Sequence, residues 1–215
     1  MAALLAGSLA LIGIVSGWRG VDLPAQIYRV GLFHRLGLTL WDSQWYGGHW
    51  TLDYSVIFPP VAGVIGIEAT TVLSAAAAAW AFDRLVVGRY GSAGRAGSLA
   101  FALGTVVQSA IGQLPFLMGE ALALLAVGAA VRRRWPAAIV LALAATLASP
   151  LAGAFLALAI VSWLVATWPR QRVGLTLVAA AVATPIVVAA VLFPGQGMFP
   201  FPPRDFAWEL GTCVG

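Results

Sequence analysis

Long apolar runs recur along almost the whole chain and leave few charged side chains to face water. Hydrophobic residues make up 61% of the 215 residues, and charged residues make up only 9%. About 20 apolar residues in a helix cross the roughly 30 Å hydrocarbon layer of a membrane. A soluble domain needs more charge than this to solvate its surface. The sequence therefore predicts an all-α fold, a polytopic bundle of transmembrane helices.

The apolar runs predict about seven membrane spans, which together form a helical domain over residues 1–193. The first run has no basic region before it and no small-residue cleavage site after it, so we interpret it as an anchor rather than a signal peptide. A tail rich in Pro, Gly and aromatic residues follows over 194–215. The predicted spans are 2–17, 55–82, 97–114, 115–131, 136–149, 150–168 and 173–193.

The arginines predict the orientation of this bundle in a cell membrane. All twelve basic residues are arginine, and eight of them lie in three loops between predicted spans. Because basic loops gather on the cytoplasmic side, we expect a cytoplasmic N-terminus, a long first extracytoplasmic loop over 18–54, and an extracytoplasmic tail. Topology explains the arginines better than a nucleic-acid partner does, so none is expected. The eight are Arg84, Arg89, Arg95, Arg132, Arg133, Arg134, Arg170 and Arg172.

The predicted external loop contains a carboxylate among aromatic residues. Asp42 lies between Trp41 and Trp45, at the expected membrane edge. A partly desolvated acid in such a place can act as a general base or hold a metal ion, although a plain surface acid is the alternative. ATP and nucleotide sugars are generally absent outside the cytoplasm. Any donor of a transferred group is therefore expected to be lipid-linked.

Two segments around this acid resemble the first external loop of the PIG-V-like mannosyltransferases, polytopic enzymes of the GT-C superfamily. The segments are 41–46 (Trp-Asp-Ser-Gln-Trp-Tyr) and 54–60 (Tyr-Ser-Val-Ile-Phe-Pro-Pro). In that family a Trp-Asp pair begins the motif, an aromatic pair follows, and a Phe-Pro element opens the next helix. The layout of about seven spans is also similar. Family members usually continue into further helices or an external domain, so the resemblance implies a compact or truncated relative.

The resemblance implies transfer of a mannose-like sugar from a polyprenyl-phosphate donor to an extracytoplasmic glycan or glycolipid acceptor. Arabinose or another polyprenyl-linked sugar is equally compatible with the residues. Asp42 is then the general base that accepts the proton of the acceptor hydroxyl. A divalent cation (Mg²⁺ or Mn²⁺) or an arginine is expected to neutralise the leaving phosphate. Membrane lipids are the other expected partners.

Candidate binding residues surround Asp42 in the external segments. A short interfacial helix is expected over 24–36, and its two arginines are candidates for the donor phosphate or, equally, for lipid headgroups. Aromatic residues here either contact sugar or anchor the loop in the headgroup zone. Asp42, Asp53 and His49 form a candidate metal site. The substrate-binding candidates are Trp41, Trp45, Tyr46, His49, Arg29, Arg35, Glu120 and Arg204.

Two acids fall inside predicted spans, where an unpaired charge is costly. Glu68 is expected about 20 Å below the site if a helix runs on from Ser55. It is interpreted as a structural residue bonded to another helix, or as a residue in transport. Glu120 follows Pro115 closely, near the outer face, so we expect it either to join helices or to reach the cavity of Asp42.

Two other functional classes stay open at this stage. A noncatalytic assembly or lipid-binding subunit also fits a short membrane protein. A transporter fits less well, because few polar residues lie in the middle of the spans, although Ser149-Pro150 has the form of a broken helix. Substitution of Asp42 separates the classes, since only a transferase depends on it for turnover.

Overall fold

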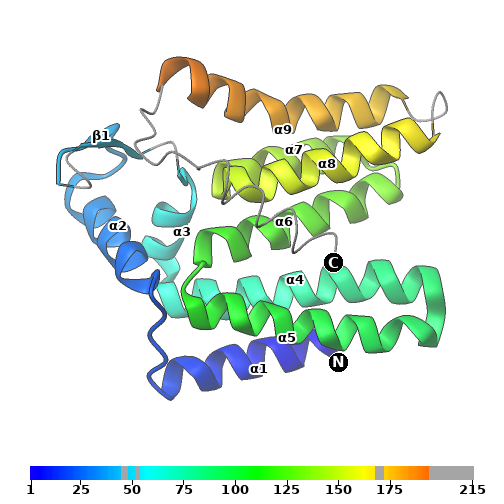
Figure 1. Ribbon diagram of the computed structural model, residues 1–215, viewed down its shortest axis with the longest axis horizontal. Helices are drawn as coiled ribbons and strands as arrows, with labels where there is room; N and C mark the ends of the chain where they lie inside the picture. Colours follow the sequence, from blue (N-terminus) through cyan, green and yellow to red (C-terminus); the bar gives the residue numbers. More distant parts are fainter. Residues whose placement is uncertain (45–47, 52–53, 168–171, 194–215) are drawn as a thin grey trace, which may run out of the picture.

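The computed structural model describes residues 1–44, 48–51, 54–167 and 172–193. Within these ranges, long helices lie lengthwise side by side and form a bundle (Figure 1). One helix lies in the middle of the bundle, α6, which packs on α4 on one side and on α7 and α8 on the other. The helices of the bundle are α1 (Ala2–Val15), α4 (Ile67–Tyr90), α5 (Arg95–Ile111), α6 (Leu114–Val131), α7 (Trp135–Ala148), α8 (Pro150–Thr167) and α9 (Arg172–Leu192).

Four segments of the described chain are long and apolar enough to cross a membrane: Ile67–Ile111, Leu114–Val131, Pro150–Thr167 and Arg172–Leu192. The first of them turns back on itself at η2 (Gly91–Gly94), so that α4 and α5 pack against each other. The helices α1 and α7 are apolar but shorter. The structure thus agrees with a helical membrane protein, whereas the number of seven spans stays a prediction.

The predicted span over 55–82 is wrong as a single helix. Gly66 separates α3 (Phe58–Ile65) from α4, and its φ of 93° belongs to a backbone region that side-chain-bearing residues rarely adopt. Glu68 consequently lies exposed in the first turn of α4, and not deep inside a span. The predicted boundary near 114 lies where α5 ends and α6 begins, and the one near 149 lies where α7 ends and α8 begins.

Proline explains where many of these helices begin. A proline occupies one of the first two positions of α3, α6, α7 and α2 (Leu23–Leu36), and Pro150 is the first residue of α8. The first N–H groups of a helix have no partner within the helix, so proline loses nothing there and its fixed φ favours the helical turn. These prolines separate apolar runs that would otherwise continue into one another.

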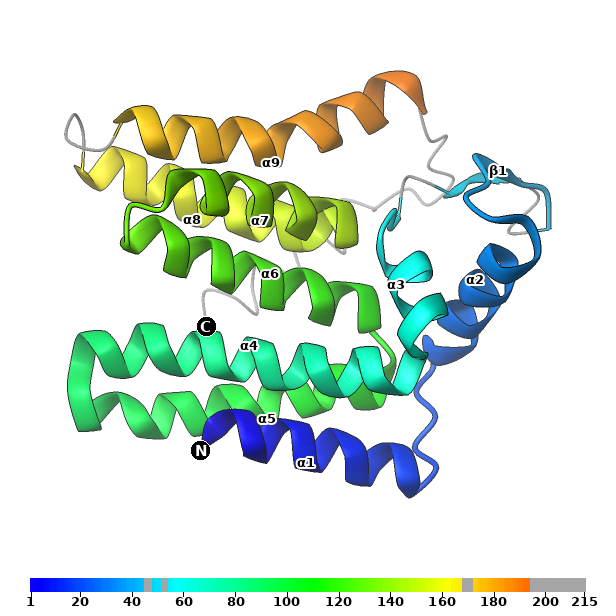
Figure 2. The same cartoon turned by 180° about the vertical axis from the view of Figure 1, so that it is seen from behind.

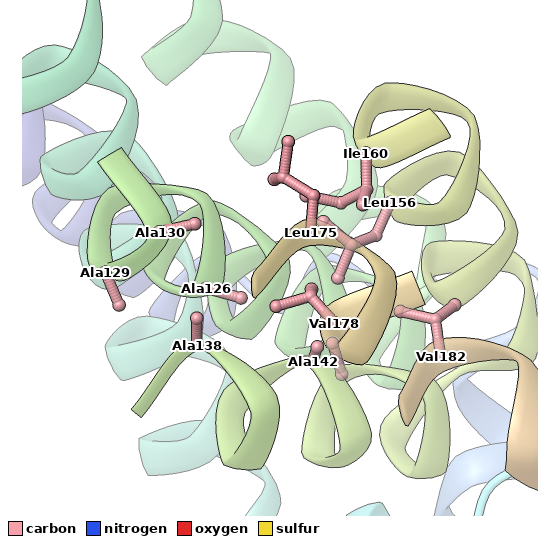
Figure 3. Close-up of a cluster of buried hydrophobic side chains, with 11 residues drawn as sticks. Ala126, Ala129, Ala130, Ala138, Ala142, Leu156, Ile160, Leu175, Val178 and Val182 are labelled. Carbon is pink, nitrogen blue, oxygen red and sulfur yellow. The ribbon is translucent and has the colours of Figure 1, made fainter. Parts of the chain in front are cut away.

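The bundle core is built from small side chains. Alanines of α6 and α7 lie against leucine, isoleucine and valine side chains of α8 and α9 in the largest buried cluster (Figure 3). Small residues let helix backbones approach closely. One close approach involves Gly119 of α6, where an added Cβ would lie 2.7 Å from the Cβ of Ala152 and 3.1 Å from the carbonyl oxygen of Ala145.

One end of the bundle is covered by an end cap, which consists of α2, α3 and a hairpin of β1 (Trp41–Asp42) and β2 (His49–Trp50) (Figures 1 and 2). Backbone hydrogen bonds hold the cap to the bundle. The Asp22 N–H donates to the Ile111 carbonyl over 3.1 Å, and the N–H groups of Val56 and Ile57 donate to the Leu147 carbonyl over 2.8 and 3.3 Å. The turn η2 and the α6–α7 turn lie at the opposite end.

Candidate functional site

The hairpin of the end cap places Asp42 beside α2. Its two strands pair antiparallel, with Trp41 opposite Trp50 and Asp42 opposite His49. The Trp41 and Trp50 rings meet edge to face, with centroids 4.9 Å apart, and the Trp50 ring also lies 5.0 Å from that of Phe193, just after α9. Aromatic contacts of this kind stabilise the hairpin against the bundle. The residues that flank the acid therefore support its position.

Asp42 is buried, with 7% of the residue surface exposed, and its carboxylate accepts two hydrogen bonds. The Tyr28 hydroxyl donates to Oδ2 over 2.7 Å, and the Gln44 backbone N–H donates to Oδ1 over 2.9 Å. The bond to Asp42 raises the pKa of Tyr28 above its ordinary value, since loss of the phenol proton would place two negative charges together. Both bonds orient the carboxylate while leaving each oxygen a second lone pair for a further donor.

Arg29 lies one residue after Tyr28 on α2 and faces the same region. Its Nη2 donates to the carbonyl oxygens of Thr51 and Ser55 over 2.8 and 3.2 Å, and its guanidinium carbon lies 4.6 Å from the centre of the Tyr54 ring. Burial lowers the pKa of Arg29, and the negative charge of Asp42 is among the influences that oppose this shift. An arginine pKa starts so high that the group stays cationic at neutral pH.

Arg29 and Asp42 line a cavity of about 40 Å³ together with Thr51, Ser55 and Pro59. A single water needs about 10–15 Å³ of such space. The cavity therefore accepts a hydroxyl group or a few water molecules, and not a whole sugar ring. The charged groups that line it are the buried carboxylate of Asp42 and the half-buried guanidinium of Arg29, at the end of an apolar helical bundle.

Glu120 lies in a different place from Asp42. It lines a groove of about 380 Å³ between α5, α6 and α8, together with Gln108, Phe116 and Phe155. In the described part of the chain, Oε2 of Glu120 and Oε1 of Gln108 are buried without a hydrogen-bond partner. Gln108 and Glu120 thus share this groove, whereas Glu120 is not among the residues that line the Asp42 cavity.

The remaining candidates divide into two groups. Arg35 is exposed on α2 and does not line the cavity, although its charge acts on Tyr28. The predictions for Trp45, Tyr46, Asp53 and Arg204 fall outside the described residues, and only the backbone of His49 is described. Among the described side chains, no group of three or more His, Cys, Asp or Glu could hold a metal ion. The predicted metal site therefore stays a prediction.

Sequence reasoning missed Tyr28, Thr51 and Ser55. Tyr28 stands fourteen residues before Asp42, and no spacing rule links a helix to a later strand at that separation. Thr51 and Ser55 contribute backbone carbonyls to Arg29, and any residue type supplies such a group. The one available signal was the placement of Tyr28 next to Arg29 in the same helix.

Comparison of the chain with models of known protein families, with curated protein sequences and with solved structures finds no match. The function is therefore argued from the site itself.

Proposed function

We propose that this chain is a membrane glycosyltransferase of the GT-C type, which moves a mannose-like sugar from a polyprenyl-phosphate donor to a glycan or glycolipid acceptor. The observation that supports it most is the pair formed by Asp42 and Arg29 around one small cavity. A buried carboxylate with fixed orientation suits proton abstraction, and a cation beside it suits a leaving phosphate. The long apolar helices suit a membrane, in which a polyprenyl donor resides.

In the proposed reaction, an acceptor hydroxyl enters the cavity and donates its proton to the Asp42 carboxylate. The hydroxyl oxygen forms a bond to the anomeric carbon of the donor as the bond from that carbon to the phosphate oxygen breaks. The phosphate oxygen keeps the electron pair, and the configuration at the anomeric carbon inverts. The cavity volume of about 40 Å³ suits the reacting hydroxyl, while the rest of the acceptor remains outside.

Two residues have supporting roles in this proposal. Tyr28 keeps the carboxylate oriented through its 2.7 Å hydrogen bond, and it is a positioning residue. Arg29 stabilises the negative charge that develops on the departing phosphate.

The proposed orientation puts the end cap outside the cytoplasm. At the end opposite the cap, Arg95 directly follows η2, and Arg132 to Arg134 lie in the α6–α7 turn. Basic turns favour the cytoplasmic face. A polyprenyl-phosphate sugar then supplies the sugar on the outer side, where soluble nucleotide sugars are generally absent.

The test is sugar transfer from a panel of radiolabelled polyprenyl-phosphate sugars by the purified full chain in lipid. We expect turnover with one donor class, and a loss of at least about 100-fold in Asp42→Asn, since general-base catalysis contributes roughly 10²–10⁴-fold. Glu68→Gln is the matched control: it removes an exposed carboxylate at the same end of the bundle and should retain activity. Helical circular dichroism verifies that each variant is folded.

Two results would contradict the proposal. Absence of turnover with every donor, for folded wild-type protein, would favour a noncatalytic lipid-binding or assembly subunit. Full activity in Asp42→Asn would reject Asp42 as the base even if transfer occurs.

A further inference from the structure

A second groove lies far from the end cap, between the last turns of α4 and α6. Its volume is about 450 Å³, and it is lined by side chains from both helices. On α4, Trp80, Arg84 and Gly88 follow one another at intervals of four residues. Residues four apart lie on the same face of a helix, so these three form one wall. Leu124 and Gly128 of α6, with Arg132 directly after the helix, form the facing wall with the same spacing.

The groove changes character along its length. Trp80, Leu124 and Leu125 make its inner part aromatic and apolar. Its outer part carries the guanidinium groups of Arg84, Arg89 and Arg132, all of them exposed. The groove is thus apolar inside the bundle and cationic at the end of the bundle. This arrangement matches a phospholipid, whose acyl chains are apolar and whose phosphate is anionic.

Charge at the outer part of the groove favours an anion. Among the described residues, Arg84 and Arg132 make no ion pair with a carboxylate, and Arg89 lies 5.7 Å from the centre of the Tyr90 ring. The nearby Asp83 accepts a 2.5 Å hydrogen bond from Ser98 of α5. The carbonyl ends of α4 and α6 each contribute about half a negative charge. Three guanidinium groups therefore leave a clear positive excess.

Two glycines keep the groove open. An added Cβ at Gly88 or at Gly128 would meet no atom within 4 Å. Larger side chains at these positions would therefore occupy the groove without disturbing the packing of α4 on α6. This allows the apolar part of the groove to be blocked while every charge is kept.

We propose that this groove binds one anionic phospholipid, with the headgroup phosphate between Arg84, Arg89 and Arg132 and an acyl chain along Trp80 and Leu124. The proposal is independent of the transferase activity, because the groove shares no residue with the cavity of Asp42. Charge complementarity and the order of apolar and cationic surfaces identify the occupant as a lipid rather than a soluble anion.

The experiment is native mass spectrometry of the full chain in detergent, titrated with phosphatidylglycerol, phosphatidylcholine or glycerol phosphate. We expect one phosphatidylglycerol to bind, and neither of the other two at the same concentration. Combined Arg84→Gln and Arg132→Gln substitution should weaken binding roughly tenfold or more. Gly128→Leu should weaken it similarly without loss of charge. Arg134→Gln, which removes a charge from the same turn but outside the groove, should change binding less than about threefold.

Three results would overturn the proposal. Unchanged binding in Gly128→Leu would show that the acyl chain does not use the groove. If Arg134→Gln weakened lipid binding as much as the combined Arg84→Gln and Arg132→Gln substitution, binding would reflect a diffuse attraction between a basic surface and anionic lipid. Equal affinity for glycerol phosphate would identify the ligand as a soluble phosphate and not a phospholipid.

Discussion

The Tyr28 hydroxyl lies 2.7 Å from Oδ2 of Asp42 and donates a hydrogen bond to it, which ties helix α2 to the hairpin of the end cap. Tyr28→Phe removes this donor and keeps the aromatic ring. We expect kcat for sugar transfer to fall about 10- to 100-fold with little change in KM, because a hydrogen bond to a charged group contributes about 1.5–3 kcal/mol. Tyr90→Phe, outside the end cap, should leave kcat unchanged. A large rise in KM alone would assign Tyr28 to substrate binding instead.

The same bond makes the ionisation of Tyr28 sensitive to Asp42. Its pKa is raised above 10.0 by the hydrogen bond to the carboxylate, so the bond stabilises the folded protein below pH 10 and is lost as pH rises through the folded-state pKa. An ultraviolet titration of phenolate, as the difference between wild type and Tyr28→Phe, isolates this group. We expect the pKa to move down towards 10.0 in Asp42→Asn. An unchanged titration would mean that the bond does not form in the membrane.

The side chain of Arg29 contributes both a positive charge and a planar guanidinium group, and a substitution can remove the second while keeping the first. Arg29→Lys keeps the cation, but the point charge of an ammonium group does not reproduce the planar contact with Tyr54 and the two carbonyls. We expect a rise in donor KM of about fivefold or more and faster proteolysis in the hairpin. Arg35→Lys changes an exposed residue on the same helix and should alter KM less than twofold. A KM that changes less than twofold in Arg29→Lys as well would indicate that only the positive charge of Arg29 matters.

Close packing at Gly119 predicts a stability difference between two glycines of α6. Gly119→Ala places a Cβ 2.7 Å from that of Ala152, so we expect destabilisation of about 1–3 kcal/mol. Gly128→Ala points into open space and should stabilise the helix by about 0.5–1 kcal/mol. Denaturant or thermal unfolding in detergent measures both. Stabilisation by both alanines would show that α6 and α8 lie further apart than described.

Much of the bundle was predictable because its signals are local. The length of each apolar run identifies a helix. Pro115, Pro136 and Pro150 mark where α6, α7 and α8 begin. The break at Gly66 was not predictable, since apolar residues flank it on both sides and Gly63, three residues earlier, is accommodated inside α3. A glycine in a helix and a glycine that ends one look alike in a sequence.

At the candidate site, Asp42 and Arg29 were both predictable, because an acid among tryptophans and a basic residue in an expected interfacial helix are local patterns. The contact between Asp42 and Tyr28 depends on how the hairpin lies against α2, which is a tertiary property. Of the two roles expected for Glu120, a contact with the cavity of Asp42 likewise depends on tertiary structure. Its distance from Pro115 indicates its depth, but the rotation of α6 about its axis directs it to the groove with Gln108 rather than to the cavity of Asp42.

The carbonyl of Leu147, which accepts hydrogen bonds from Val56 and Ile57, has a consequence for biosynthesis. A ribosome releases the hairpin and α3 long before it releases α7, so the end cap lacks this anchor while α4, α5 and α6 enter the membrane. The cap can reach its final shape only when α7 arrives beside it. Misplacement of an intervening helix would therefore disturb the end cap indirectly, through the position of α7.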